Sequence, residues 1–194
     1  MARLPPSPSA TSNDSSDAPR VGANAANEPS FRYARPTMSV ATEQQRLYVS
    51  PDPGATSALG RALAGAARAG DVICLWGDLG AGKTHLAKAF GAGLGVAETI
   101  TSPSFILMAE YEGRLPLFHI DLYRLADASD ALSGGLIDDR QSGGVTLMEW
   151  PDRLGPALPA ERLDVIIDGS GDEPRSITVR AHGLGPRRYL EVVP

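Results

Sequence analysis

The sequence has little cysteine, no long hydrophobic run and no apolar N-terminal segment. Cys74 is the only cysteine among 194 residues, so an internal disulfide and a cysteine-rich metal site are both excluded. The longest apolar stretch, residues 72–76, has the length of a strand and is far shorter than the ~20 residues that a membrane helix needs. The N-terminus also lacks the apolar core of a secretory signal. We therefore expect a cytoplasmic protein with no membrane segment.

The sequence is also poor in positive charge. The whole chain carries a net charge of −5 with a pI near 5.2. Residues 47–194 hold 13 basic and 19 acidic residues, which gives 13 − 19 = −6. A protein that binds nucleic acid directly needs a basic surface, because the phosphates must be neutralised. We therefore expect any contact with nucleic acid to pass through other proteins.

Composition divides the chain into two regions. Residues 1–46 contain seven Ser and six Pro with no apolar period, a composition typical of a disordered tail. Acidic residues in this region argue against a transit peptide, and Met38 offers an alternative natural start. Residues 47–194 are expected to form one folded domain.

Within the predicted domain, strands and helices alternate. Strands are expected at residues 46–50, 72–76, 145–149 and 163–168. Helices are expected at residues 56–69 and 83–94. Residues 105–111 and 115–120 flank a glycine turn and predict a hairpin, while 176–181 and 189–193 would close the sheet or pack on it. This order predicts an α/β fold with a mostly parallel central sheet, flanking helices and one antiparallel hairpin.

The strongest motif joins a predicted strand to a predicted helix and matches the phosphate-binding pattern G-x-x-x-x-G-K-[ST]. It consists of Gly77, Asp78, Leu79, Gly80, Ala81, Gly82, Lys83 and Thr84. The glycines let backbone N–H groups turn toward phosphates, and the following helix directs its positive end at them. Lys83 is expected to reach the outer phosphates, and the Thr84 hydroxyl to ligate Mg²⁺. The motif therefore predicts a P-loop NTPase.

Acidic residues at two further strand ends are candidates for the metal side of this site. Glu149 ends the apolar strand 145–149 and could hold the metal, act through water or orient the attacking water; the alternative is a solvent-facing acid. Alternation places His119, Asp121 and Tyr123 on one side of another strand, with Asp121 as a candidate Mg²⁺ or water partner. Arg124 could pair with a carboxylate or phosphate, and His119 could equally be a structural histidine.

A hydroxyl-rich loop precedes the predicted hairpin. Residues 101–105 read Thr-Ser-Pro-Ser-Phe and would form either a switch that senses the terminal phosphate or an ordinary turn. A GTPase would carry N-K-x-D, which this sequence lacks, so ATP is the expected nucleotide.

In combination these segments resemble the TsaE family, also called YjeE, the bacterial ATPases of tRNA threonylcarbamoyladenosine synthesis. The resemblance rests on the P-loop, residues 101–105, His-x-Asp-x-Tyr-Arg at 119–124 and Glu-Trp-Pro at 149–151, and covers roughly residues 47–181. It implies a compact fold that binds ATP and Mg²⁺ and acts with TsaD and TsaB. The slow hydrolysis would reset that complex, and tRNA would be met only through these partners.

The resemblance also assigns residues to roles. Lys83 and Thr84 take the phosphate and metal roles, while Asp121 and Glu149 become the metal-side and catalytic acids. Ser104 falls in the switch loop, where the family usually has threonine. It further implies that Thr56 and Arg175 lie near the base side of the nucleotide.

Two other functions fit a P-loop domain of this size. A small-molecule kinase would need an acceptor pocket and an arginine-bearing lid, whereas the arginines of this chain are scattered. A nucleotide-dependent binding switch with negligible turnover would not need a catalytic acid, so Glu149 argues against it.

Overall fold

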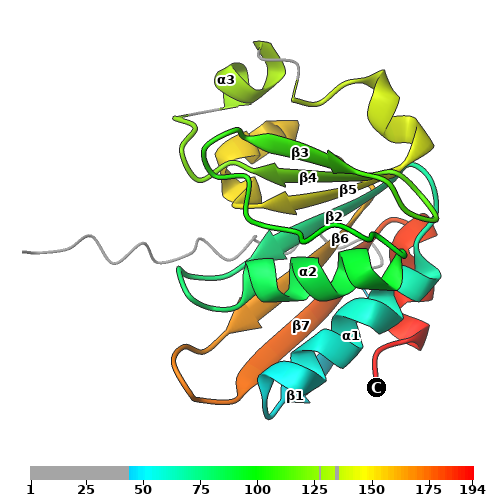
Figure 1. The fold of residues 1–194 in the computed structure, drawn as a ribbon, viewed down its shortest axis with the longest axis vertical. Coiled ribbons are helices and arrows are strands. Elements are labelled where there is room, and N and C mark those ends of the chain that lie inside the picture. The colour runs from blue at the N-terminus through cyan, green and yellow to red at the C-terminus, as the bar shows by residue number, and fades with distance from the viewer. Residues whose placement is uncertain (1–43, 127, 134–135) are drawn as a thin grey trace, which may run out of the picture. The chain divides into compact units, whose positions relative to one another are not determined.

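The computed structural model describes residues 44–126, 128–133 and 136–194. The predicted tail therefore lies almost wholly outside the described residues, and the boundary at 46 and the alternative start at Met38 stay predictions. In the described part, a seven-stranded sheet has the order β1-β7-β6-β2-β5-β4-β3 (Figure 1). No helix of the described ranges is long and apolar enough to cross a membrane.

The elements follow the predicted alternation closely. The strands are β1 (Gln44–Ser50), β2 (Asp71–Trp76), β3 (Met108–Tyr111), β4 (Leu117–Asp121), β5 (Val145–Glu149), β6 (Arg162–Asp168) and β7 (Arg175–His182). The α-helices are α1 (Pro53–Ala66), α2 (Lys83–Gly93) and α3 (Ala128–Ser133). Three 3-10 helices complete the description: η1 (Asp139–Gly143), η2 (Pro151–Ala157) and η3 (Gly185–Glu191).

The sheet is mixed, so the prediction of a mostly parallel sheet holds only for its centre. Strands β6, β2, β5 and β4 run parallel to their neighbours in that group. The β1–β7, β7–β6 and β3–β4 pairs are antiparallel, which makes half of the six pairings antiparallel. Residues 169–174 are too few for a parallel crossover, which needs a dozen residues or more, so β6 and β7 form a hairpin.

Two predicted segments take a local form that the sequence did not specify. Residues 189–193 were expected to close the sheet or pack on it, and they pack on the core: they fall in and after η3, which begins at Gly185 and buries Tyr189 and Leu190. Strand β3 begins at Met108 rather than at residue 105, because the N–H groups of Ile106 and Leu107 both bond to the carbonyl of Pro103. Both segments use local turns in place of sheet pairing.

Helix α1 begins three residues before its predicted start. Pro53 occupies its first turn, and the Asp52 carboxylate accepts a hydrogen bond from the Ala55 N–H at 2.8 Å, which is an N-cap. At the other end, Arg114 donates to the carbonyls of Ala64 and Ala67 at 2.6 and 3.2 Å. The turn between β3 and β4 therefore stabilises the C-terminal end of α1.

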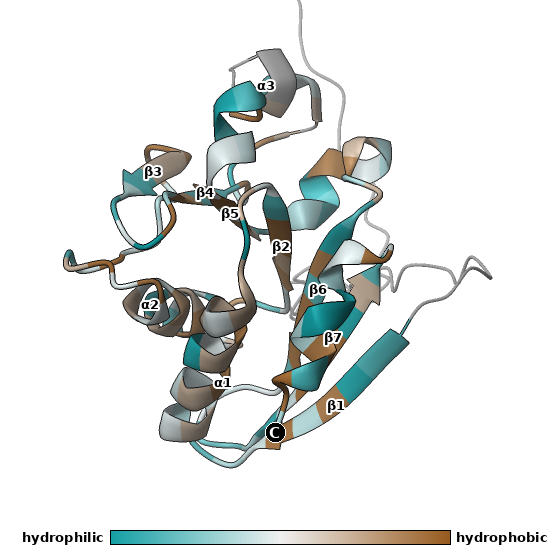
Figure 2. Ribbon diagram, turned by 90° about the vertical axis from the view of Figure 1, so that its right-hand side faces the viewer, coloured by the Kyte–Doolittle hydropathy of each residue, from teal (hydrophilic) through white to brown (hydrophobic). Residues whose placement is uncertain are grey.

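Two apolar clusters lie on opposite faces of the sheet. The larger one packs α1, α2 and η3 on one face and includes Leu59, Phe90 and Tyr189. The smaller one lies on the other face, beneath α3 and η2, and includes Ile120 and Met148. Figure 2 shows the buried strand β2 as strongly apolar and the edge strand β1 as largely polar. This packing fixes the carboxyl ends of β2, β5 and β4 at one edge of the sheet.

Candidate functional site

The loop between β2 and α2 has the form that the phosphate-binding motif predicts. Gly82 caps α2 in the left-handed conformation, with φ of 112°, and no side chain of the described residues caps the first turn. At the start of the loop, a Cβ on Gly77 would lie 2.5 Å from the Ile167 carbonyl oxygen. The uncapped N–H groups and the positive end of α2 are therefore left for an anion such as a phosphate.

Lys83 is buried at the inner side of this loop. Its Nζ donates to the carbonyl oxygens of Gly77 and Asp78 at 2.7 and 2.9 Å. It also lies 3.9 Å from the centre of the Trp150 ring, a cation–π distance. Burial lowers the pKa of Lys83, and the nearby carboxylates of Glu149 and Asp121 oppose that shift. The ammonium group is therefore held next to the phosphate loop.

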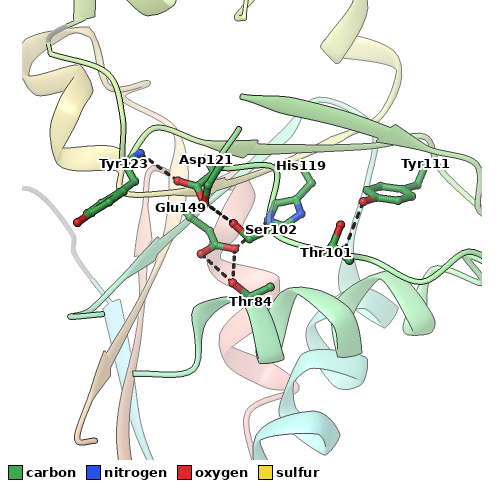
Figure 3. A network of polar contacts seen from close by, with 9 residues as sticks. Thr84, Thr101, Ser102, Tyr111, His119, Asp121, Tyr123 and Glu149 are labelled. Carbon is green, nitrogen blue, oxygen red and sulfur yellow. Dashed lines mark hydrogen bonds and ion pairs between the residues drawn. The ribbon is translucent and has the colours of Figure 1, made fainter. Parts of the chain in front are cut away.

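Glu149 ends β5 and faces the first turn of α2. The Thr84 hydroxyl donates to both carboxylate oxygens, at 3.0 Å to Oε1 and 3.2 Å to Oε2 (Figure 3). His119 Nε2 lies 3.0 Å from Oε1 on the other side of the carboxylate. The Glu149 side chain is only 3% exposed. It is therefore not a solvent-facing acid, which the sequence had left as an alternative.

The Thr84–Glu149 pair fits the requirements of a bound Mg²⁺. Mg²⁺ needs few protein ligands when it is bound together with phosphates, and prefers hydroxyl and carboxylate oxygens. No cluster of three His, Cys, Asp or Glu side chains suited to a metal occurs among the described residues. A metal here would therefore depend on the nucleotide and on water for the rest of its ligands, as it does in P-loop NTPases.

Asp121 ends β4, directly beside Glu149 in the parallel register. Its Oδ2 accepts hydrogen bonds from Ser104 and, at 2.6 Å, from Ser102, while the Tyr123 N–H donates to Oδ1 at 2.9 Å. The two serine oxygens also lie 2.7 Å apart, and because each hydroxyl has one proton, at most two of these three contacts are made at a time. Asp121 thus holds the hydroxyl-rich loop at residues 101–105 through Ser102 and Ser104, and whether this loop is a switch or an ordinary turn stays a prediction.

Three neighbouring side chains have contacts that sequence reasoning did not foresee. Trp150 has φ of 58°, which is unusual for a non-glycine residue, and its ring lies 4.9 Å from that of Tyr123. Arg124 was expected beside a carboxylate or phosphate, but its guanidinium lies over the Phe105 ring at 4.2 Å. Only the sequence Glu-Trp-Pro signalled that Trp150 belongs to the site.

Thr56 and Arg175 line a separate cavity of about 350 Å³ beside the P-loop. Ala81, Gly82 and His85 form the P-loop side of this cavity. The Thr56 hydroxyl bonds to Ser50 at 2.7 Å, and Arg175 Nε donates to the Ala81 carbonyl at 3.0 Å. Both residues therefore lie next to the phosphate loop, and their contact with a base stays a prediction.

Comparisons with known proteins match most of the described part of the chain. Residues 50–177 match the family model described as "Threonylcarbamoyl adenosine biosynthesis protein TsaE". The protein named "tRNA threonylcarbamoyladenosine biosynthesis protein TsaE" of Bacillus subtilis is 44% identical over 133 residues, which cover 68% of this chain and 83% of that protein. The protein of the same name from Treponema pallidum is 42% identical over 110 residues, covering 57% and 82%.

A solved structure agrees with these matches. The crystal structure of Bacillus subtilis YdiB is similar with a TM-score of 0.63 and 35% sequence identity. The similarity covers 78% of this chain and 93% of YdiB. The sequence matches and the fold therefore indicate the same relationship.

Proposed function

The chain belongs to the TsaE family of tRNA threonylcarbamoyladenosine biosynthesis proteins, and from this we propose that it is a Mg²⁺-dependent ATPase that binds and resets a TsaD–TsaB complex. The ATPase activity is carried by one observation: the Thr84 hydroxyl, at the start of α2, donates to the buried carboxylate of Glu149. A hydroxyl and an acid joined in this way beside a phosphate loop are the protein groups that Mg²⁺–nucleotide sites require.

The side chains of the site divide the work on the triphosphate. Lys83 would exchange its bonds to the Gly77 and Asp78 carbonyls for phosphate oxygens and add positive charge there. Mg²⁺, when bound, would neutralise charge on the outer phosphates. Glu149, which accepts the hydrogen bond from Thr84, would orient or deprotonate an attacking water. Asp121 would act through the Ser102 and Ser104 hydroxyls that it holds.

We place the nucleoside in the cavity beside the P-loop. This cavity adjoins the P-loop at Ala81 and Gly82, and its volume of about 350 Å³ is within the range of small-molecule sites. Thr56 and Arg175 line it, and the resemblance implies that both lie near the base side of the nucleotide. ATP is the expected nucleotide, since the sequence lacks the guanine-reading motif.

The loops around the triphosphate site expose apolar side chains suited to a protein partner. Leu79 in the P-loop is 77% exposed, and Phe105 and Ile106 in the switch loop are 84% and 68% exposed. Tyr123, after β4, is also exposed. Exposed apolar groups gathered around a polar site are typical of protein interfaces. With a charge of −6 over residues 47–194, this surface favours TsaD and TsaB over tRNA itself.

A reconstituted assay tests the activity. We expect slow phosphate release from ATP that requires Mg²⁺, increases when TsaD and TsaB are added, and disappears in Lys83→Ala. Single-turnover measurements with the partners present separate an ATPase from a binding switch. If no ATP is hydrolysed under these conditions while nucleotide still binds, the protein is a switch and the ATPase proposal is wrong.

A second experiment tests the partner surface. We expect the TsaD–TsaB complex to bind this protein more tightly with an ATP analogue than with ADP, and Ser104→Ala to reduce that difference. Phe105→Ala should weaken binding by roughly tenfold, as loss of an aromatic anchor does. Leu47→Ala is the matched control, because Leu47 is an exposed apolar residue of β1 away from these loops. Equal losses in both variants, or tight tRNA binding without partners, would contradict the proposal.

A further inference from the structure

A buried histidine touches the carboxylate of the proposed catalytic acid. His119 lies in β4 and is fully buried, and its Nε2 is 3.0 Å from Glu149 Oε1. Its other ring nitrogen, Nδ1, has no hydrogen-bond partner in the part of the chain that the structure describes. A histidine that only stabilises a core usually has both nitrogens bonded, since a buried unpaired polar atom is costly. The polar contact of this ring is instead directed at Glu149.

The chemistry of the carboxylate sets the hydrogen-bond directions around Glu149. In its ionised form a carboxylate only accepts hydrogen bonds, and the proton of this contact then belongs to His119 Nε2. The Thr84 hydroxyl donates to the same carboxylate from the α2 side. Glu149 is therefore held between one donor from β4 and one from α2 (Figure 3).

We infer that His119 is a positioning residue for the hydrolysis reaction, a role that rests on the proposed ATPase function. A glutamate side chain has three rotatable bonds, and fixing it carries an entropic cost during each turnover unless the protein holds it beforehand. The His119 contact holds the carboxylate at the end of β5, where it faces Thr84. Misplacing a catalytic group by about 1 Å can cost roughly a hundredfold in rate.

Two substitutions separate positioning from packing. His119→Leu removes the donor and keeps a buried side chain, while His119→Gln places an amide N–H near the position of Nε2. We expect kcat for ATP to fall by roughly ten- to a hundredfold in His119→Leu and to recover most of that loss in His119→Gln. The affinity for ADP, measured by calorimetry, should change little in either variant, since His119 has no contact with the P-loop backbone among its described bonds.

A second histidine provides the matched control. His182 in β7 bonds to the buried Asp164 carboxylate at 2.7 Å, outside the proposed site. His182→Leu should lower the melting temperature and leave kcat unchanged. Crystals of the His119 variants, grown without nucleotide, add a readout independent of activity: the Glu149 carboxylate should leave Thr84 in His119→Leu and stay in His119→Gln.

The outcomes distinguish this inference from the proposed function. Absence of ATP hydrolysis by the wild-type protein with its partners would refute the ATPase proposal itself. If the wild-type protein hydrolyses ATP, a His119→Leu variant with wild-type kcat refutes the positioning role. Equal losses of kcat in folded His119→Leu and His119→Gln, with Glu149 unmoved in both crystals, would also refute it.

Discussion

Glu149→Gln is the most direct test of the chemistry, because the site accommodates the change with little rearrangement. Thr84 Oγ1 and His119 Nε2 both lie 3.0 Å from Glu149 Oε1, while Oε2 is 3.2 Å from Thr84 Oγ1. A glutamine that places its carbonyl oxygen at Oε1 keeps both of these donors. The substitution therefore removes the charge and basicity of the side chain and leaves its shape and its main contacts in place.

The expected effect is on the chemical step. An amide neither takes a proton from water nor offers a charged oxygen to a metal. Removal of a general base typically lowers the rate by ~10²–10⁴-fold. We expect kcat to fall at least about a hundredfold, which corresponds to ~2.7 kcal/mol of activation free energy. The affinity for ADP measured without Mg²⁺ should not fall, because the substitution removes a negative charge near the phosphates.

The assay needs two measurements and one control. Phosphate release at saturating Mg²⁺ and ATP, with TsaD and TsaB present, gives kcat, and calorimetric titration with ADP gives the affinity. Glu110→Gln makes the same chemical change at an exposed acid that pairs with Arg140 outside the site, and should behave as the wild type. An unchanged kcat in Glu149→Gln would refute its role and transfer the search for the catalytic acid to Asp121.

Further predictions concern the nucleotide, the N-terminal region and pH. Thr84→Ala should mainly raise the Mg²⁺ concentration needed for half-maximal hydrolysis, and equal turnover of GTP and ATP would contradict the expected nucleotide. Removal of residues 1–37 should leave ATPase activity and melting temperature within error, since their composition predicts a tail that buries little surface. Burial raises the pKa of Asp164, but hydrogen bonds from His182 and Arg162 outweigh it and hold that pKa below its ordinary value. The carboxylate then stabilises the fold above the ordinary aspartate pKa of about 4, and this stabilisation is lost as the pH falls through the lower folded-state value. Acid unfolding curves of Asp164→Asn should accordingly be flatter in that range than those of the wild type.

The centre of the fold could be predicted from the sequence because its signals are local. The apolar run 72–76, followed by the glycine loop and an alanine-rich helix, specifies β2, the P-loop and α2 without knowledge of the rest. The edges of the sheet could not be predicted in this way. Pairing of β1 with β7 joins residues more than 120 positions apart, and nothing in either segment states its partner. For residues 189–193 the sequence left two alternatives, closing the sheet or packing on it, and the structure has them packed on the core as part of η3.

The candidate site could likewise be predicted from the sequence only in part. Glu149 and Asp121 could be placed near the P-loop because parallel strands end at one edge of a sheet, and the register confirms that they are neighbours. Their separate hydrogen-bond partners could not be predicted, since these depend on how α2 and the switch loop pack over the strand ends. The hydrogen bond from Thr84 to Glu149 and that from Ser102 to Asp121 join residues that are distant in sequence, so only the folded structure shows which acid each hydroxyl contacts.

The contacts of the site give a physical reason to expect slow turnover from the isolated protein if it is the proposed ATPase. Lys83, Thr84 and Ser104 each hold a protein partner, namely a backbone carbonyl, Glu149 and Asp121. Each existing bond contributes about 0.5–1.5 kcal/mol to the protein without nucleotide. The binding free energy that ATP obtains from these three groups is therefore only the difference between the new bonds and the bonds that they replace. Ser102 and Ser104 both contact the Asp121 carboxylate, and a loop that turned these hydroxyls toward a terminal phosphate would give up those contacts. A partner that binds the exposed Phe105 and Ile106 of this loop can offset that cost, which explains how a TsaD–TsaB complex would accelerate hydrolysis without supplying a catalytic group.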